Sequence, residues 1–468
     1  MDKSIFLLLS GSLTGLGNTY CNGQNLLPKP NFIIFQVDDL GWTDIGCFGS
    51  KFYETPNIDK LAANGMKFTN AYAPCAVSSP SRAAILTGRY PARIGITDWI
   101  RASFQIPATL DMSNLPEYET VKGKSLQTPL NPFEMKLSEF TIAEMLKPHG
   151  YVTCHIGKWH LGDQGFYPEN QGFDINIAGC DFGEPPTFFD PYIRPANPDW
   201  KEPEFSFPNL KPRQPGEYLT DREADEAEKF IHEHANSPFF LYYSPYAVHL
   251  PLQAKEHMVE KYRNKPAGLQ KNPKYAAMIE SMDEALGRLI KALTEKGLLE
   301  NTVLIFTSDN GGLKGITDNS PLRAGKGFPY EGGIRVPFIV HWPSNVKGGS
   351  VNETPVQNTD LFPTIAKIAG IPLPNHPIDG KSILPLIQQQ GKFSNRALFW
   401  HFPHYRNNDT GPYSIVRKGD FKMIRFYDPK KEVLYNLKND PSETTDIAGS
   451  YPKILNDLQK EMDQLIVS

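Results

Sequence analysis

Residues 31–41, NFIIFQVDDLG, decide the fold class of this chain. An almost continuous apolar run of this length, rich in Ile, Phe and Val, predicts a strand buried on both faces, as in parallel sheets. The run ends in two adjacent carboxylates, Asp38 and Asp39, and the following Leu-Gly pair predicts a turn. The stretch therefore predicts a buried strand that places two carboxylates at one edge of a sheet.

Four further runs have the same character and alternate with amphipathic helical patterns. They cover residues 151–156, 239–244, 302–307 and 336–341. The clearest helices begin at Thr220, where Thr220 and Glu223 match a capping box, and extend from Met278 to Leu293 at helical spacing. This alternation predicts an α/β fold with a mostly parallel central sheet flanked by helices.

The sequence pattern changes near residue 390. Short strand patterns follow over residues 397–401, 413–417, 421–426 and 432–436, and a helical pattern covers residues 454–466. We therefore expect a main α/β domain over residues 28–390 and a smaller C-terminal α+β domain, carrying an antiparallel sheet, over residues 391–468.

The N-terminal segment matches a secretory signal peptide. Lys3 precedes a short apolar run that starts at Ile5, and polar residues follow from Asn18. Neither this run nor any later one is long enough to span a membrane. Residues 1–24 are expected to direct export to the periplasm or the medium. A lipid anchor on Cys21 is the less favoured alternative, because Thr-Tyr precedes that cysteine.

The charge balance limits the classes of partner. Lys and Arg total 48 against 52 Asp and Glu, a net charge of -4. Such a chain has no global positive field to attract nucleic acid or acidic lipid, so any anionic ligand must be held by a local site. The five cysteines are scattered without a CxxC pair. This spacing argues against a disulfide framework or a structural zinc site and favours free thiols.

A second strand also ends in polar residues, since residues 308–312 read SDNGG. The carboxyl ends of parallel strands open on one edge of the sheet, where α/β folds place their sites. Asp38, Asp39, Asp309 and Asn310 would there offer the hard oxygen ligands that Ca²⁺ or Mg²⁺ prefers. Each pair alone is explained equally well as a turn or a cap. Their shared edge favours a metal site.

Residues 78–88, SSPSRAAILTG, predict a short helix with Ser79 as its cap and Gly88 at its end. This places Ser78 at the helix N-terminus and Arg82 one turn further on. Free amides, the helix dipole and the guanidinium could then converge on an anion. On these residues alone, an ordinary capped helix is the simpler interpretation.

Three loops bring further basic or titratable groups to the same edge. Lys158 and His160 stand two residues apart after the strand at 151–156, so they point the same way in an extended chain. His249 follows the strand at 239–244, and Lys326 lies in a glycine-rich stretch. Each of these residues also has an ordinary explanation as a surface or core residue.

Together, these motifs resemble those of the formylglycine-dependent sulfatases of the alkaline phosphatase superfamily, over nearly the whole chain from about residue 28. The groups that it resembles include bacterial exo-acting carbohydrate sulfatases, arylsulfatase A and N-acetylgalactosamine-6-sulfatase. The family signature is Cys or Ser, any residue, Pro, any residue, Arg, and residues 78–82, SSPSR, fit it. Cys75 is out of register with that signature. The resemblance implies an alkaline phosphatase-like fold.

The resemblance also implies cofactors and residue roles. Ca²⁺ would be held by Asp38, Asp39, Asp309 and Asn310, with the modified residue at Ser78 completing its ligands. Formylglycine made from Ser78 would supply the nucleophile. Arg82, Lys158, His160, His249 and Lys326 would hold the formylglycine and the sulfate, with a protonated His249 as the acid for the leaving oxygen.

The resemblance further implies a maturation partner, a formylglycine-generating enzyme of the type that oxidises Ser. If Ser78 instead stands in place of a natural Cys, the chain as given is inactive. The implied substrate is a sulfated saccharide, preferably a terminal galactose or N-acetylgalactosamine sulfate. Residues 167–195 resemble the corresponding region of exo-acting carbohydrate sulfatases.

His401 and His404 are candidate sugar contacts, because they lie in an aromatic stretch of the smaller domain. Strand and turn packing is an equally good explanation for this stretch. Two other functions stay open. One is hydrolysis of phosphate monoesters, phosphate diesters or phosphonates by a member of the same superfamily. The other is binding of sulfated glycans without turnover, with Ser78 unmodified.

Overall fold

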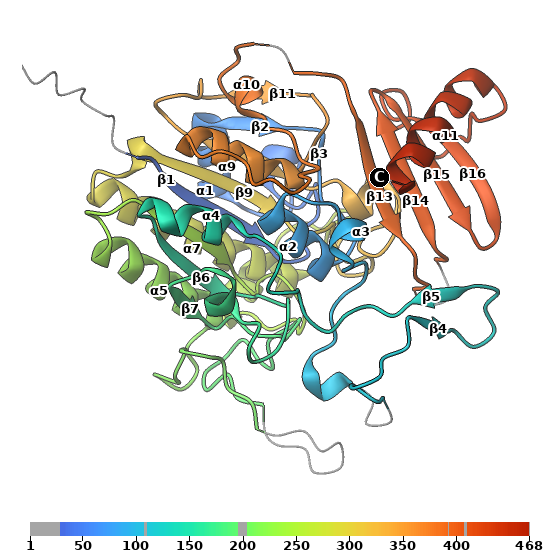
Figure 1. Cartoon of the computed structure of the whole chain (residues 1–468). Helices are drawn as coiled ribbons and strands as arrows, with labels where there is room; N and C mark the ends of the chain where they lie inside the picture. The colour runs from blue at the N-terminus through green and yellow to red at the C-terminus, as the bar shows by residue number, and fades with distance from the viewer. Residues whose placement is uncertain (1–28, 107–109, 195–203, 392, 407–409, 468) are drawn as a thin grey trace, which may run out of the picture.

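An eight-stranded sheet forms the centre of the larger part of the molecule (Figure 1). The computed structural model describes residues 29–106, 110–194, 204–391, 393–406 and 410–467. The strands of this sheet are β1 (Asn31–Val37), β2 (Met66–Phe68), β6 (Val152–Gly157), β7 (Ile175–Ile177), β8 (Phe239–Ser244), β9 (Thr302–Ser308), β10 (Phe338–His341) and β11 (Ser350–Asn352). Their order across the sheet is β11-β2-β10-β9-β1-β8-β6-β7.

The sheet is mostly parallel, as predicted. β1 pairs in parallel with both β8 and β9, so that Ile33 lies between Leu241 and Leu304. β6 joins β8 and β7 in the same direction. The strand predicted at 336–341 is present as β10, but it runs antiparallel to β9 and β2. Its carboxyl end therefore lies at the edge opposite the one where β1 ends.

Helices cover both faces of the sheet (Figure 1). The helices on one face are α1 (Pro56–Asn64), α5 (Leu219–Glu233), α6 (Glu256–Arg263) and α7 (Pro273–Glu295), which pack around Ile33 and Phe35 of β1. The helices on the other face are α2 (Ser78–Thr87), α3 (Pro91–Ile94), α4 (Ile142–Leu146), α9 (Leu361–Ala369) and α10 (Leu384–Ile387), which pack around Phe32 and Ile34. Alternate residues of β1 thus enter two separate apolar layers.

Two short strand pairs and one short helix lie outside the main sheet. They are β3 (Ala71–Tyr72) paired with β12 (Val356–Gln357), β4 (Tyr118–Thr120) paired with β5 (Gln127–Pro129), and α8 (Glu331–Ile334). No helix among the described residues is both long and apolar enough to span a membrane. The predicted signal peptide at 1–24 lies outside the described residues, as does Cys21. The other four cysteines have free thiols.

The capping box predicted at the start of α5 is wrong. The helix begins at Leu219 with Tyr218 in the N-cap position, so Thr220 lies inside the helix. Glu223 is fully buried and its Oε1 accepts a hydrogen bond from the backbone N–H of Tyr246, at 3.3 Å. The carboxylate therefore fastens the loop after β8 instead of capping its own helix.

The C-terminal part forms a four-stranded antiparallel sheet with one helix, shown at the right of Figure 1. Its elements are β13 (Ala397–Phe402), β14 (Tyr413–Lys418), β15 (Phe421–Tyr427), β16 (Lys430–Asn436) and α11 (Pro452–Val467). One face of the sheet packs on α11. The other packs on residues 72–77, and the indole N–H of Trp400 donates to the carbonyl of Ala73 at 2.7 Å. The small sheet therefore supports the segment that leads into Ser78. The domain boundary near residue 390 stays a prediction.

A buried charge cluster joins the two parts. Lys422 Nζ of β15 lies 3.1 Å from Glu331 Oε1 of α8 and 2.8 Å from Glu443 Oε1, and all three side chains have no exposed surface. Burial raises the pKa of Glu443 to about 7, although Lys422 acts to lower it. Removing the shared cation would leave Glu443 without this counter-ion and Glu331 with the more distant Arg335, 3.7 Å away.

We expect Lys422→Met to lower the free energy of unfolding by about 3 kcal/mol, because breaking a buried ion pair from one side is costly. Urea denaturation measures this loss. The matched control is Lys418→Met in the neighbouring strand, whose partner Glu461 is partly exposed. That change is expected to cost less than about 1 kcal/mol. Equal losses in the two variants would contradict the assigned role of the cluster.

Candidate active site

Four neighbouring parallel strands end at one edge of the sheet and deliver polar side chains there. Strands β9, β1, β8 and β6 are adjacent in the order. Asp38 and Asp39 follow β1, Asp309 and Asn310 follow β9, and Lys158 follows β6. The structure therefore brings together the groups that the sequence placed at this edge. The chain order of the strands does not reveal their adjacency, since β8 ends at Ser244 and β9 begins at Thr302, far along the chain from β1.

Ser78 is the first residue of α2 and lies at the centre of these groups. Its Oγ is 3.4 Å from Asp38 Oδ1 and 3.3 Å from Asn310 Oδ1, and Lys158 Nζ donates to it at 3.3 Å. The residue is 2% exposed. Its hydroxyl is thus held between two acceptor oxygens and one ammonium group.

The start of α2 differs from the prediction. Val77 is the N-cap residue and no side chain caps the helix, so the assignment of Ser79 as cap is wrong. The Ser79 Oγ instead accepts the backbone N–H of Ile100 at 2.9 Å. The helix ends as predicted at Gly88, which adopts the left-handed conformation that favours glycine, with φ 69°.

Arg82 is fully buried and its guanidinium is directed at protein groups. Nε and one terminal nitrogen donate to Asp309 Oδ2 at 3.0 and 2.8 Å. The other terminal nitrogen donates to the carbonyl of Lys158 at 2.8 Å and to Ser244 Oγ at 2.6 Å. Arg82 therefore orients the Asp309 carboxylate and the backbone carbonyl of Lys158. It does not line the pocket.

The acidic groups form a buried oxygen-rich cluster. The backbone N–H of Asp39 donates to Asp309 Oδ1 at 3.1 Å, and the Asn310 amide donates to Asp39 Oδ1 at 2.8 Å. Asp38, Asp39, Asp309 and Asn310 are at most 2% exposed. Carboxylate and amide oxygens suit a hard divalent cation, so the donor set fits Ca²⁺ or Mg²⁺.

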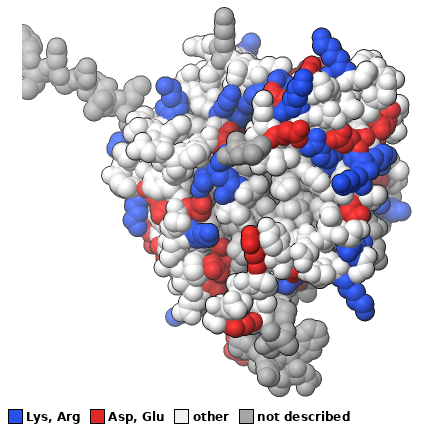
Figure 2. Space-filling view, turned by 45° about the vertical axis from the view of Figure 1, so that its right-hand side comes forward, with Lys and Arg blue, Asp and Glu red and all other residues white. Residues whose placement is uncertain are grey.

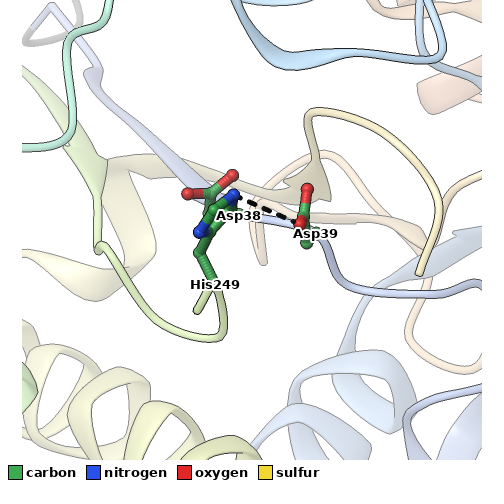
Figure 3. A group of neighbouring side chains, drawn as sticks. All are labelled: Asp38, Asp39 and His249. Carbon is green, nitrogen blue, oxygen red and sulfur yellow. Dashed lines mark ion pairs between the residues drawn. The ribbon is translucent and has the colours of Figure 1, made fainter. Parts of the chain in front are cut away.

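His249 also approaches this cluster. Figure 3 shows its ring beside Asp38 and Asp39, and ligand atoms of these three residues lie within 4.8 Å of one another. Its Nε2 is 3.5 Å from Asp39 Oδ2. The resemblance implies that His249 contacts the substrate and not the metal. Its position at the border of the pocket is compatible with that role.

Two lysines balance the carboxylates. Lys158 Nζ is 2.7 Å from Asp38 Oδ2, and Lys326 Nζ is 2.7 Å from Asp39 Oδ1. Burial raises the pKa of Asp38 to about 8, outweighing the lowering by Lys158. Burial also acts to raise the pKa of Asp39, but Lys326 and His249 hold it well below the ordinary value. A divalent cation beside Asp38 would lower its pKa and favour the carboxylate form.

The free site holds His249 neutral, contrary to the protonated imidazole expected from the resemblance. Burial lowers the pKa of His249 to about 3, and the positive charge of Lys326 contributes. Its Nδ1 donates to the carbonyl of Leu250 at 3.1 Å. Its Nε2 therefore accepts from the Lys326 ammonium, 3.0 Å away. In this pair Lys326 Nζ is the donor, and His249 Nε2 is the acceptor that can pass a proton on.

A pocket of about 700 Å³ opens above Ser78. Lys158, His160, His249 and Lys326 line it together with Ser78, as expected for an anion-binding site. His160 is fixed by a hydrogen bond from Nε2 to the carbonyl of Ile100, at 2.8 Å. Gly183 permits this placement, because a Cβ there would come within 2.7 Å of the His160 ring.

His401 and His404 do not line this pocket, so the structure does not place them as sugar contacts. In β13, side chains alternate between faces, and Trp400 and Phe402 face the main domain. His401 points the other way and bonds to Ser414 Oγ at 2.8 Å. The His404 ring bonds to Thr97 Oγ1 at 2.7 Å. Strand and turn packing explains both.

Several residues of the pocket wall were not singled out from the sequence. Trp99, Phe104, Phe182, Glu184, Arg194 and Arg406 line it. Phe182 and Glu184 lie within the segment 167–195 that resembles carbohydrate sulfatases. Trp99 and Phe104 lie in a loop with no periodic pattern, and only their aromatic character gives a signal. Ser244, the partner of Arg82, is the polar end of an otherwise apolar strand.

Comparison with protein families matches two family models. The model described as Sulfatase matches residues 30–371. The model described as N-sulphoglucosamine sulphohydrolase, C-terminal, matches residues 324–468. Together they span the described chain from β1 to α11.

Curated relatives share about a third of their residues with this chain. A sulfatase of Formosa agariphila is 34% identical, covering 91% of this chain and 85% of its own length. Human arylsulfatase A is 31% identical, covering 94% of this chain and 88% of its own length. Human N-acetylgalactosamine-6-sulfatase is 34% identical, covering 80% of this chain and 68% of its own length.

Solved structures have the same architecture. The crystal structure of Ps i-CgsB in complex with k-i-k-neocarrahexaose has a TM-score of 0.77 and 31% identity, covering 93% of this chain and 92% of its own. The phosphonate monoester hydrolase of Agrobacterium radiobacter has a TM-score of 0.63 and 20% identity over 92% of this chain and 94% of its own. This second likeness shows the fold alone.

Proposed function

The chain belongs to the sulfatase family, whose members are sulfuric ester hydrolases, and on that premise we propose that it hydrolyses saccharide sulfate esters with a nucleophile made from Ser78. The fold supports this proposal, because the structural relatives confirm the alkaline phosphatase-like architecture predicted from the sequence. The observation that carries it is the position of Ser78 Oγ, within 3.4 Å of Asp38, Asn310 and Lys158, below a pocket lined by basic groups.

Ser78 is proposed to be oxidised to formylglycine by a maturation enzyme of the Ser type. Formylglycine supplies a hydrated aldehyde, whose second hydroxyl allows sulfate to be released after attack on sulfur. Lys158 and Asp38 are the groups around Ser78 that orient such a nucleophile and receive or release its protons. A plain Ser would lack the second hydroxyl, so its sulfate ester would be hard to remove.

Asp38, Asp39, Asp309 and Asn310, completed by the modified Ser78, are proposed to hold Ca²⁺. The cation supplies positive charge that favours deprotonation of the nucleophile. Arg82 keeps the Asp309 carboxylate in place through two hydrogen bonds. The Tyr275 hydroxyl donates to the Asp39 carbonyl at 3.2 Å and thereby fixes the backbone of the loop after β1.

The sulfate ester is proposed to bind between Lys158, His160 and Lys326. Lys158 and Lys326 place positive charge and N–H donors around the pocket floor, where negative charge spreads over the sulfuryl oxygens in the transition state. His160 is held by its Nε2 on the carbonyl of Ile100, and it shapes the wall between the two lysines. His249 stands beside Lys326 and is proposed to pass a proton to the leaving sugar oxygen. Because burial keeps the imidazole neutral, the proton for the leaving oxygen comes from Lys326 Nζ through His249 Nε2, and Lys326 then regains a proton from water.

His249→Ala is expected to lower kcat/KM for a sugar sulfate about 100-fold, and for a nitrophenyl sulfate less than about tenfold. The reason is that an alkoxide needs a proton on leaving, whereas a nitrophenolate does not. Steady-state kinetics on the two substrates measure the difference. Lys255→Met, which removes a surface ion pair outside the pocket, serves as the control. Equal losses on both substrates would refute the proton-transfer role.

The substrate is proposed to be a terminal galactose or N-acetylgalactosamine sulfate. The aromatic walls formed by Trp99, Phe104 and Phe182 support a sugar ring next to the sulfate site. The names of N-acetylgalactosamine-6-sulfatase and of the structure with bound neocarrahexaose support a galactose-type sugar. Export through residues 1–24 to the periplasm or the medium would bring the enzyme to such glycans.

Matched sulfate and phosphate esters test the reaction class. We expect sulfate release to exceed phosphate release at equal substrate concentration, because the pocket offers one oxygen-rich metal site among the described residues. Faster phosphate turnover would contradict the proposal and favour a phosphoesterase. Tight binding of sulfated glycans without turnover, by protein from the natural host, would instead indicate a binding protein.

A further inference from the structure

The walls of the pocket carry more positive charge than one sulfate ester requires. Among the described residues that line it, the basic side chains are Lys158, Arg194, Lys326 and Arg406, and the acidic side chain is Glu184. Lys158 and Lys326 are each 2.7 Å from a carboxylate of the buried cluster. Arg194 and Arg406 are the basic groups of the outer wall, and Arg194 stacks over the Phe104 ring, 3.8 Å from its centroid.

Arg406 is built into the pocket through a close contact with the loop of Lys326. Its Nε lies directly over Gly327, where a Cβ would come within 2.4 Å. Gly327 has φ 84°, and its N–H donates to the carbonyl of Ala76, two residues before Ser78, at 2.8 Å. The guanidinium thus packs beside the segments that carry Lys326 and Ser78. Backbone hydrogen bonds between Arg406 and Thr410 fix the main chain that carries this side chain.

The acidic partner of Arg406 is weak. Among the described residues its ion-pair partner is Asp98, whose Oδ1 is 3.9 Å from the guanidinium, beyond hydrogen-bond distance. That oxygen already accepts the backbone N–H of Trp99 at 2.8 Å. Burial raises the pKa of Asp98 to about 6, so this carboxylate becomes protonated in mildly acidic solution. The Arg406 side chain is 24% exposed and borders the pocket.

We propose that Arg406 binds a second anionic group of the saccharide, a sulfate or a carboxylate, beside the sulfate that is hydrolysed. This inference rests on the proposed function and narrows its substrate class to saccharides with two negative charges. The planar guanidinium offers paired N–H donors that match the oxygens of either group. Lys158 and Lys326 belong to the proposed site of the first sulfate, whereas Arg406 stands on the outer wall, so Arg406 adds selectivity for the second group.

Calorimetric binding to protein with unoxidised Ser78 tests this directly, without turnover. The ligands are one sugar with a single sulfate, the same sugar with two sulfates, and a disaccharide that joins the singly sulfated sugar to a uronic acid. We expect the wild-type protein to bind at least one doubly charged ligand about tenfold or more tightly than the singly charged sugar. The preferred ligand identifies the second group as sulfate or carboxylate.

Arg406→Gln is expected to reduce that preference, expressed as the ratio of Kd values, about 10- to 100-fold, as for loss of a charged hydrogen bond. Arg101→Gln is the matched control, because Arg101 also acts on Asp98 but lies outside the pocket. It should keep the wild-type preference. A wild-type protein that binds singly and doubly charged sugars alike, or an unchanged ratio in Arg406→Gln, would overturn the inference.

Turnover of a nitrophenyl sulfate distinguishes failure of the second anion site from failure of the proposed function. Release of sulfate from that ester by mature wild-type protein, combined with no role of Arg406 in the binding ratio, would overturn the second anion site alone. Absence of sulfate release from any ester by fully oxidised protein would overturn the proposed function. The inference on substrate class would then fall with it.

Discussion

Ser78→Ala is expected to reduce sulfate ester turnover at least about 10⁴-fold, the scale seen when a nucleophile is removed from a catalytic unit. The structure gives the reason, because Ser78 is the one residue with a hydroxyl or thiol among the described residues that line the pocket. No neighbour can replace it. Cys75, the closest thiol in sequence, is buried away from the pocket, and burial raises its pKa to about 12.

The control is Ser79→Ala, one residue further along the same helix. Ser79 Oγ bonds to the backbone of Ile100 and does not line the pocket, so its loss should lower stability by about 1 kcal/mol while turnover persists. Ser78→Cys, made in a host that oxidises Cys to formylglycine, should recover turnover. Turnover by Ser78→Ala comparable with that of the Ser79 variant would exclude Ser78 as the nucleophile.

Asp309→Asn is expected to weaken Ca²⁺ binding and to reduce turnover about 10³-fold. The change removes one of three clustered carboxylates and also the negative charge that Arg82 bonds twice, at 2.8 and 3.0 Å. The amide keeps the shape and one acceptor oxygen, so the helix carrying Ser78 should stay in place better than with Ala. Calorimetric titration with Ca²⁺ and turnover at saturating Ca²⁺ measure the two effects separately.

Asp283→Asn provides the matched control, since Asp283 is also a buried carboxylate but lies outside the pocket. It accepts hydrogen bonds from the backbone of Asn57 and Ile58 at 3.1 and 2.8 Å. We expect it to lower stability and to leave the affinity for Ca²⁺ unaltered. Unchanged Ca²⁺ affinity and turnover in Asp309→Asn would contradict the proposed metal site.

The strands that form the site were predictable because buried parallel strands leave a strong pattern. The runs that became β1 and β9 are continuous and apolar, and both end at polar residues within one position of the observed ends. The rule for parallel sheets then predicts that both groups of polar residues lie at one edge, but it does not predict that β1 and β9 are neighbours. The overall charge was also informative. Lys and Arg alternate with Asp and Glu on the face seen in Figure 2, and no continuous basic surface covers its described part.

Helix starts and strand faces were less predictable because tertiary contacts decide them. Ser79 and Thr220 have good capping chemistry, yet the observed caps lie two residues earlier, at Val77 and Tyr218. His401 lies in a correctly predicted strand, but the packing of Trp400 on the main domain turns it to the other face. A one-residue alternation is enough to move a side chain away from a pocket.

The protonation state of His249 could not be predicted from its neighbours in sequence. Lys326, which lowers its pKa and bonds to its ring, stands 77 residues away and comes from a different loop. Arg406 ends the aromatic stretch that was expected to fold over the pocket and bind sugar, and it lines the pocket where His401 and His404 do not. Its place beside Gly327 depends on how the small C-terminal sheet docks on the segment before Ser78.

The most direct test of the central claim combines mass spectrometry of residue 78 with sulfate release from a panel of singly and doubly sulfated galactose and N-acetylgalactosamine isomers. The account predicts formylglycine at position 78 and release of sulfate from particular positional isomers, in proportion to the oxidised fraction. Fully oxidised protein that releases no sulfate from any member of the panel, or unoxidised protein that turns over as fast, would contradict it.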